Sequence, residues 1–163
     1  MKRKLAMAAM IPLLAASTCW AVRGYLFTDL DTYIKHGKQI VLAEALESGN
    51  PDKHEDGLYV AKVKVSKVLA GKTRLGKLQI YTIYPLSRGE LYLLYSSSDP
   101  PDFQSTSELS VVSVPNGFDV KRLNGKSLKQ QLVVIFEASR SQMSRDLRMG
   151  QKQYELLGKA IAP

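Results

Sequence analysis

A series of short β-rich segments in the middle of the chain restricts the fold more than any other feature of the sequence. The clearest segment is Leu58–Leu69. Its polar residues Lys62, Lys64 and Ser66 alternate with alanine and valine, a period of two that predicts a strand with one solvated face and one packed face. Turn residues separate it from the other predicted strands, which are Gln39–Glu47, Leu78–Tyr84, Glu90–Tyr95, Leu109–Val114 and Phe118–Val120. Consecutive strands with short connections predict a small barrel or sandwich.

Helical patterns flank the predicted strands. We expect a short helix over Leu26–Gly37, with Thr28 as its N-cap and a glycine as its stop. Near the other end, Ser127 is placed to cap a helix whose apolar residues recur at helical spacing, and we expect this helix to reach about Met149. Tyr154–Ala160 is expected to add a last short turn. The predicted fold class is mainly β with helices, a β-barrel with a C-terminal helix.

The first residues have the pattern of a secretion signal. Three cations at positions 2–4 precede a short apolar stretch that ends in small residues. We favour cleavage after Ala21, and cuts after Ala16 or Ser17 also fit. The alternative is an uncleaved membrane anchor, because the 18 residues of Leu5–Val22 lie at the short edge of a bilayer span. The sequence predicts export to the periplasm or the extracellular space, with residues 1–21 as the signal peptide.

The remaining chain has the size of one domain. Residues 22–125 are expected to form the barrel with its short N-terminal helix. Residues 126–163 are expected to form a basic helical segment that packs on the barrel or extends from it. The only cysteine, Cys19, lies in or beside the signal, so no internal disulfide is predicted for the mature chain.

The positive charge gathers toward the C-terminal end. The formal net charge of +8 falls to +5 when the three cations of the signal leave and no acid leaves with them. Residues 23–120 contain 11 basic and 12 acidic side chains, whereas residues 121–163 contain 9 basic and 3 acidic ones. Such an end can dock on anionic lipid, an anionic envelope polymer or an acidic protein, and a solvated helix face is the alternative interpretation. If the helix binds a partner, the residues expected to supply the charge are Arg140, Arg145, Arg148 and Lys152.

Three short apolar patterns follow one another in the predicted barrel. They are Ile-Val-Leu-Ala at Ile40–Ala43, Val63–Gly71 ending in Lys-Val-Leu-Ala-Gly, and Gly-Glu-Leu-Tyr-Leu-Leu at Gly89–Leu94. In this order they resemble bacterial netrin-like domains, which are related in fold to tissue inhibitors of metalloproteinases. Phe118–Val120 is similar to the short strand that often closes the barrel in such chains. The resemblance covers roughly residues 39–125 and implies an oligonucleotide/oligosaccharide-binding (OB) barrel.

The residues that make such inhibitors active are mostly missing here. In the inhibitors, the amino group and carbonyl of an N-terminal cysteine cap the zinc of the protease, and several disulfides hold this end in place. Cys19 stands alone, so a protease inhibitor acting through a mature N-terminus at Cys19 is an alternative and not the leading hypothesis. Lipidation of Cys19 would attach the protein to a membrane, although Ala16-Ser17-Thr18 departs from the usual Leu-Ala-Gly approach.

The sequence lacks the motifs that are typical of catalytic sites. His36 and His54 are its only histidines, and neither has the helical spacing with glutamate that holds zinc. It contains no glycine-rich phosphate loop and no nucleophile elbow. We therefore predict no enzyme activity, no cofactor and no metal site.

Nucleic acid is an alternative partner that the predicted fold raises. OB barrels stack bases on exposed aromatic side chains beside cationic grooves. The tyrosines that would form such a platform are Tyr81, Tyr84, Tyr92 and Tyr95. The predicted strands carry too little positive charge to follow a phosphate backbone, and an exported protein seldom meets nucleic acid. Nucleic acid is therefore not the expected partner.

The leading hypothesis is an exported, non-enzymatic binding module. Its expected partner is an unknown protein or an anionic envelope polymer. The predicted binding elements are the long polar loop Ser96–Ser107 and the basic C-terminal helix. Membrane contact is expected only if the signal stays uncleaved or Cys19 is lipidated.

Overall fold

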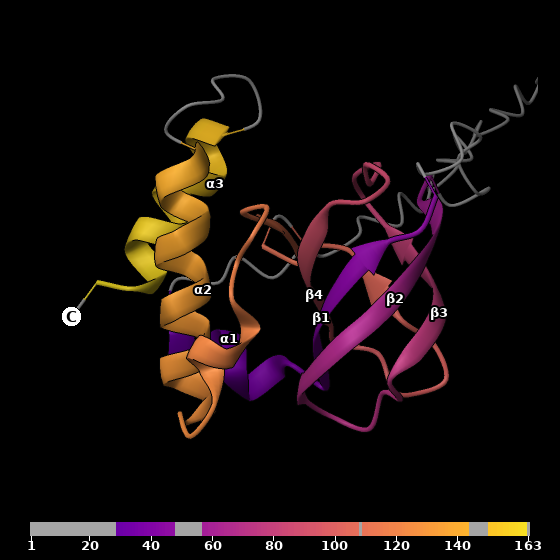
Figure 1. Ribbon diagram of the computed structural model, residues 1–163, viewed down its shortest axis with the longest axis horizontal. Coiled ribbons are helices and arrows are strands. Elements are labelled where there is room, and N and C mark those ends of the chain that lie inside the picture. The colour runs from indigo at the N-terminus through magenta and orange to yellow at the C-terminus, as the bar shows by residue number, and fades with distance from the viewer. Residues whose placement is uncertain (1–28, 48–56, 108, 144–149, 163) are drawn as a thin grey trace, which may run out of the picture.

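The computed structural model describes residues 29–47, 57–107, 109–143 and 150–162. Its helices are α1 (Leu30–His36), α2 (Leu128–Met143) and α3 (Gly150–Ala160), with a 3-10 helix, η1 (Val120–Leu123). Its strands are β1 (Gln39–Ala45), β2 (Tyr59–Ala70), β3 (Gly76–Thr82), β4 (Leu91–Ser96), β5 (Gln104–Ser105) and β6 (Val111–Val114). The strands curve into one body, and the three α-helices lie on one side of it (Figure 1).

The six strands form a nearly closed barrel. Their order in the sheet is β5-β3-β2-β1-β4-β6, and all neighbours are antiparallel except β3 and β5. β5 also contacts β4. The Ser105 hydroxyl donates a hydrogen bond to the Tyr95 carbonyl oxygen (2.9 Å), and the Gln104 amide donates one to the Ser96 hydroxyl oxygen (3.1 Å). The predicted fold class, a mainly β barrel with helices, is confirmed.

Burial explains why the strands differ in sequence pattern. In β1, Ile40 and Leu42 point out of the barrel toward the helices, whereas Val41 and Ala43 point into it, and all four side chains are buried. A strand that is covered on both faces reads as a continuous apolar run. β2 instead alternates, because exposed residues such as Lys62 lie on an outer face that faces solvent.

The interior of the barrel is one hydrophobic core. Its buried residues are Val41, Ala43, Ala45, Ala61, Val63, Val65, Ile80, Leu86, Tyr92, Leu94, Phe103 and Val111. The polar atom of Tyr92 is paired, since its hydroxyl donates a hydrogen bond to the Glu90 carboxylate (2.7 Å) and accepts one from the Ser87 amide (2.9 Å). The mixture of small and large side chains suits the narrow interior of a small barrel.

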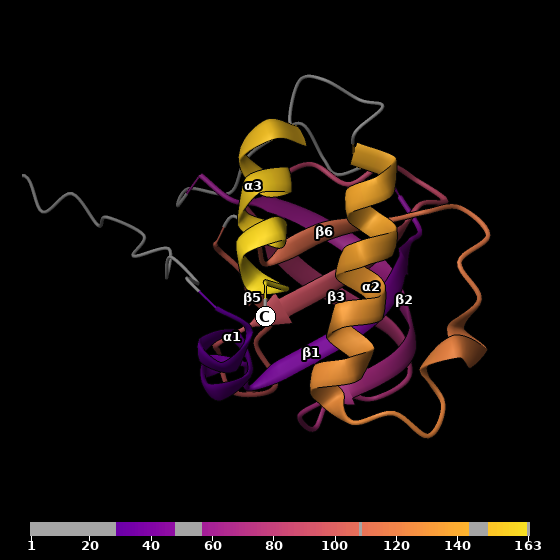
Figure 2. The ribbon, with the colours of Figure 1, turned by 90° about the vertical axis from the view of Figure 1, so that its left-hand side faces the viewer.

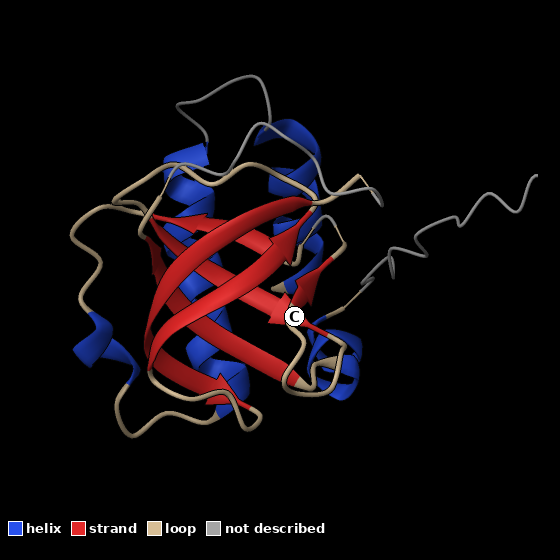
Figure 3. Cartoon of the chain, turned by 90° about the vertical axis from the view of Figure 1, so that its right-hand side faces the viewer, coloured by secondary structure: helices blue, strands red, loops and turns tan. Residues whose placement is uncertain are grey.

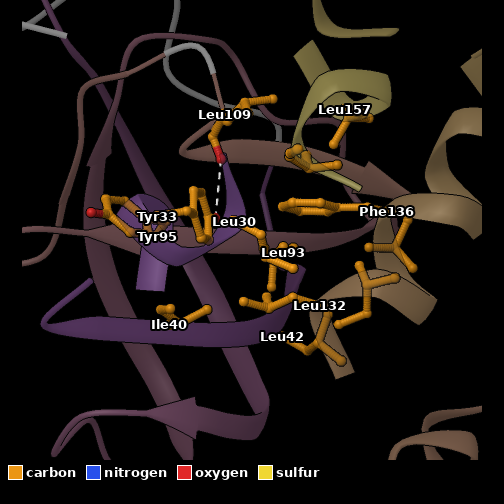
Figure 4. Close-up of a cluster of buried hydrophobic side chains, with 14 of the residues drawn as sticks. Leu30, Tyr33, Ile40, Leu42, Leu93, Tyr95, Leu109, Leu132, Phe136 and Leu157 are labelled. Atoms are coloured by element: carbon orange, nitrogen blue, oxygen red, sulfur yellow. Dashed lines mark hydrogen bonds between the residues drawn. The ribbon is translucent and has the colours of Figure 1, made fainter. Parts of the chain in front are cut away.

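A second core lies outside the barrel, between the outer face of β1, β4 and β6 and the helices (Figure 2). Phe136 of α2, Leu157 of α3 and Tyr33 of α1 all contribute buried side chains to it (Figure 4). The Tyr33 ring centre lies 4.4 Å from that of Tyr95 and 5.6 Å from that of Phe136. The Tyr33 hydroxyl donates a hydrogen bond to the Leu109 carbonyl oxygen (3.2 Å). The outer core therefore fastens all three α-helices to one side of the barrel.

The N-cap of α1 is Asp29, so the prediction of Thr28 was wrong. The Asp29 carboxylate accepts hydrogen bonds from the Thr32 amide (2.7 Å) and the Thr32 hydroxyl (2.9 Å). An aspartate at this position satisfies a free amide of the first turn and also places negative charge at the positive end of the helix. Thr28 itself lies outside the described residues.

Residues 118–120 do not form the predicted closing strand. The chain turns into η1, whose N-cap Asp119 accepts a hydrogen bond from the Lys121 amide (2.9 Å). This local bond competes with strand pairing, and Leu123 at the end of η1 is buried in the outer core. The prediction of a strand at Phe118–Val120 was therefore wrong, and β5 lies at the closure of the barrel instead.

The C-terminal helix predicted as a short turn is longer than expected. α3 has 11 residues and begins at Gly150, so the turn over Tyr154–Ala160 is the second part of a full helix. Leu157 and Ala160 are buried in the outer core, and this packing supports a helix that begins with a poor helix former. The described part of α2 ends at Met143, and the predicted extension to Met149 falls outside the described residues.

Candidate binding surface

The described residues hold no cluster suited to a metal ion. Within them, no group of three or more histidine, cysteine, aspartate or glutamate side chains comes together. His36 lies in the last turn of α1, and His54 falls outside the described residues. Of the helices that the structure describes, none combines the length and the apolar character needed to span a bilayer.

The four tyrosines that the nucleic-acid alternative requires as a base-stacking platform do not share one surface. Tyr92 points into the barrel and Tyr95 lies in the outer core, and their exposed fractions are 6% and 2%. Tyr84 packs against the inner core, while Tyr81 is half-buried on the outer face of β3. Successive residues of a strand alternate between its two faces. The alternative of a platform built from these four rings is therefore excluded by their positions.

The C-terminal cations predicted to bind a partner are described only in part. Arg140 of α2 is half-buried, and its guanidinium lies against Gly158 of α3. A Cβ added at Gly158 would lie 3.2 Å from a terminal nitrogen of Arg140. Arg140 therefore packs between the two helices. Lys152 belongs to α3, but its side chain is not described. The candidate residues that fall outside the described residues are Cys19, Arg145 and Arg148.

Other cations of the C-terminal segment also contact the body of the protein. The amino group of Lys129 lies 2.7 Å from the carboxylate of Asp31 in α1. The Arg122 guanidinium lies 5.9 Å from the ring centre of Phe118. Contacts of this exposed kind stabilise a fold only slightly. They do mean that part of the charge in this segment already has partners within the chain.

The predicted binding loop, Ser96–Ser107, is largely built into the barrel. Phe103, Ser105 and Ser107 are buried, and β5 lies within the loop. Its exposed part is the short stretch Asp99–Asp102, which carries two acids and two prolines. The exposed part of this loop is therefore unsuited to an anionic partner.

Gln39 ties this loop to the turn between β2 and β3. Its side-chain amide donates hydrogen bonds to the carbonyl oxygens of Ser98 (2.9 Å) and Asp102 (2.7 Å). Its side-chain oxygen accepts a hydrogen bond from the Thr73 hydroxyl (2.7 Å). Gln39 is 2% exposed, so these bonds satisfy a buried polar group. Three segments are thereby joined at one end of the barrel.

The strongest concentration of positive charge within one acid-free segment lies on the hairpin of β2 and β3. Residues 57–89 contain five lysines and two arginines, and no aspartate or glutamate. We call five of these residues the basic hairpin; all five are exposed, and they are Lys62, Lys64, Lys72, Arg74 and Lys77. Lys62 lies 3.2 Å from the Glu47 carboxylate. The other four make no ion pair with any residue that the structure describes.

Strand pairing places three of these lysines side by side. Lys64 of β2 is directly opposite Lys77 of β3, and Lys62 is directly opposite Gln79. Glu44 of β1 lies on the other side of Lys64 and is the described acid nearest to it in the ladder. Figure 3 looks at the barrel from the side away from α2 and α3, and in this view no described helix lies in front of the strands. The cations therefore form a row on an open sheet face.

The tip of the hairpin is held in one position. Gly71 has a positive φ of 92°, and a Cβ at this residue would collide with the Lys38 carbonyl oxygen, so only glycine allows the two segments to approach so closely. The Thr73 bond to Gln39 fixes the next part of the turn. Lys72 and Arg74 therefore extend from an anchored loop.

The sequence matches no protein-family model, and no curated protein shows significant similarity to it.

Sequence reasoning missed the basic hairpin because charge was counted over too long a window. Residues 23–120 are nearly balanced, but all their acids lie outside residues 57–89. A window of about one hairpin would have revealed the acid-free segment. The pairing of Lys64 with Lys77, by contrast, depends on strand register, which sequence pattern alone does not fix.

Proposed function

We propose that the protein is an exported, non-enzymatic binding module and that the basic hairpin is its binding surface. The observation that carries this proposal is the row of exposed cations on an uncovered sheet face, within a segment that contains no acid. A cleft or face of one sign attracts partners of the opposite sign. The proposed partner class is the one expected from the sequence. The proposed binding surface is the basic hairpin instead of the C-terminal helix.

The strand connections support an OB-type barrel as the scaffold of this module. β1, β2 and β3 follow one another as an antiparallel meander, β3 pairs with β5 in parallel, and β4 returns to pair with β1. The netrin-like patterns of the sequence agree with this arrangement at β1, β2 and β4. At residues 118–120 the agreement fails, because η1 takes the place of the strand. A netrin-like relationship is thus a proposal that rests on the first three patterns.

Export is the part of the proposal that rests on the sequence alone. The cationic start and the apolar stretch before Ala21 support it. Intact mass and N-terminal sequencing of the protein from a host that processes its signal would test it. A start at Val22 or Ser17 supports an exported module, whereas an intact Met1 contradicts cleavage.

Co-sedimentation with isolated cell-envelope material tests the binding surface. The test variant is Lys64→Gln/Lys77→Gln. The matched control is Lys35→Gln/Lys159→Gln, which removes the same charge from exposed lysines of α1 and α3. We expect the wild-type protein and the control to bind at low salt, and the test variant to bind about tenfold more weakly. Equal binding by both variants would contradict the proposal.

A further inference from the structure

We propose that the basic hairpin binds a linear anionic polysaccharide, with the carboxylates of the polymer lying along β2 and β3. This inference rests on the proposed function and adds the chemical class of the partner. It is drawn from the geometry of the cations, from the scarcity of apolar side chains among them and from the polar residues between them.

The geometry of the cations favours an extended ligand. Lys62 and Lys64 lie two residues apart on one face of a strand, which corresponds to about 6.6 Å. Lys77 faces Lys64 across the ladder, where side chains lie about 5 Å apart. A single small anion would contact one or two of these amino groups. A chain with repeated charges contacts the whole row.

The Lys64–Lys77 pair is a position where a bound anion would stabilise the ladder. Like charges directly opposite each other destabilise an antiparallel ladder. Glu44 flanks Lys64 on the far side, but it makes no ion pair within 4.0 Å with a described lysine. A bound polyanion would remove the repulsion between the two lysines, so binding and fold stability are coupled here.

The surface lacks the apolar centre that a stable protein interface needs. Protein interfaces bury a core that is rich in aromatic and apolar side chains. Beside the lysines of the basic hairpin lie the exposed Gln79, opposite Lys62, and the half-buried pair of Val60 and Tyr81 at the end of the row. At the tip, Leu75 is 68% exposed, and a single exposed leucine is ordinary on a protein surface. The same shortage of apolar groups disfavours insertion into a lipid surface.

The polar residues beside the lysines suit a sugar chain better than a nucleic acid. Single-stranded nucleic acid is held by successive bases stacking on exposed aromatic rings. Of the four tyrosines only the half-buried Tyr81 lies on this face, because Tyr92 and Tyr95 are buried in the two cores and Tyr84 packs against the inner one. On the outer face of β3 the Gln79 side-chain amide donates a hydrogen bond to the Tyr81 hydroxyl (3.5 Å), and Gln79 also carries a side-chain oxygen that can accept one. Such groups exchange hydrogen bonds with the hydroxyls of a polysaccharide.

Binding of polygalacturonate, a linear polymer with one carboxylate per sugar, tests the inference. We expect the full exported protein to bind it at low salt, with binding that weakens as salt rises. The Lys64→Gln/Lys77→Gln variant should bind about tenfold more weakly, while the Lys35→Gln/Lys159→Gln control should stay within about twofold of the wild type. Methyl-esterified polygalacturonate, which is neutral, should not bind. Circular dichroism checks that each variant is folded.

Several outcomes would overturn the inference. If the protein binds envelope material through the hairpin but does not bind polygalacturonate, the proposed function stands and the polysaccharide does not. Tighter binding, at equal charge, to a single-stranded oligonucleotide or to vesicles of phosphatidylglycerol and phosphatidylcholine would assign another class of partner. An equal loss of binding in the test and control variants would show that net charge alone is responsible.

Discussion

The outer surface of the barrel has two sides, one covered by helices and one exposed to solvent. On β1, β4 and β6 the outward residues Leu42, Leu93 and Val112 are apolar and lie beneath helices, and the exposed Glu44 stands at the edge of this covered face. On β2 and β3 the outward residues include Lys64 and Lys77, and no described helix covers them. The first face stabilises the fold, and the second carries exposed charge at little benefit to the fold.

This contrast separates residues that hold the protein together from residues that are free to bind. Burying an apolar side chain stabilises by about 1.5–3 kcal/mol, whereas an exposed ion pair contributes about 0–1 kcal/mol. In the C-terminal segment, Arg140 belongs to the first group, because it packs against Gly158 between α2 and α3. The basic hairpin belongs to the second group.

Phe136→Ala should give the largest loss of stability. Phe136 is fully buried in the outer core and its ring meets that of Tyr33 edge-on. Removal of a buried phenylalanine ring costs about 3–5 kcal/mol through lost burial and the cavity that remains. Urea denaturation measures the change in the free energy of unfolding. A loss below about 1 kcal/mol would mean that the helices are not fastened by this core.

Gln39→Ala should have a smaller effect that is strongest at one end of the barrel. It leaves the carbonyls of Ser98 and Asp102 and the hydroxyl of Thr73 without their partner. The expected loss is about 1–3 kcal/mol, because unsatisfied buried polar groups are costly. Hydrogen exchange should also accelerate in residues 96–105. Unchanged exchange in that segment would contradict the role of Gln39 as the tie between loop and hairpin.

Alkaline pH should destabilise the outer core, because Tyr33 ionises more readily in the unfolded chain. Burial raises the pKa of Tyr33 well above its ordinary value, with a further contribution from Tyr95. Below about pH 10 the tyrosine is protonated in both the folded and the unfolded chain, so it adds no pH dependence. Above about pH 10 the unfolded chain loses this proton and the folded chain keeps it. The free energy of unfolding should therefore fall by on the order of 1 kcal/mol per pH unit.

The Tyr33→Phe variant is the control for that pH dependence. It should fall less steeply than the wild type in urea denaturation series measured above about pH 10. Tyr92 remains in this variant, and since burial also raises its pKa, a smaller fall should persist. Identical slopes in the two proteins would show that Tyr33 is not the group responsible.

Lys64→Gln/Lys77→Gln should change stability least. Both lysines are exposed and neither makes an ion pair with a described residue. Exposed substitutions of this kind stay within about 0.5 kcal/mol, and relief of the like-charge pair favours the variant slightly. Thermal denaturation checks this. A loss above about 1 kcal/mol would place these lysines with the residues that hold the fold.

Period and burial allowed the strands of the barrel to be predicted from sequence. Leu58–Leu69 alternates in polarity because one face of β2 is solvated, and the segment after Gly37 is continuously apolar because β1 is covered on both faces. Two incorrect predictions fall where a hydrogen bond from a backbone amide to a nearby side chain determines the local structure. The Asp29 carboxylate accepts a hydrogen bond from the amide of Thr32, so α1 begins one residue later than predicted. The Asp119 carboxylate accepts one from the amide of Lys121, and η1 forms where a strand was predicted.

The candidate surface was harder to predict than the fold. Its charge is visible in the sequence once a window of one hairpin is used, but the sequence does not show which lysines face each other. That information depends on the register that places Lys64 opposite Lys77 and on the helices covering the other side of the barrel. Conversely, Arg140 looked available in the sequence and is packed against Gly158 in the fold.

The central claim is that the protein binds through the basic hairpin and not through the side covered by the helices. Lysine acetylation footprinting, with and without isolated cell-envelope material, tests it most directly. We expect bound material to protect Lys62, Lys64, Lys72 and Lys77 from acetylation, while the exposed lysines of α1 and α3, Lys35 and Lys159, react as before. Protection of Lys35 and Lys159 with no change at the basic hairpin would contradict it and place the binding surface on the helices.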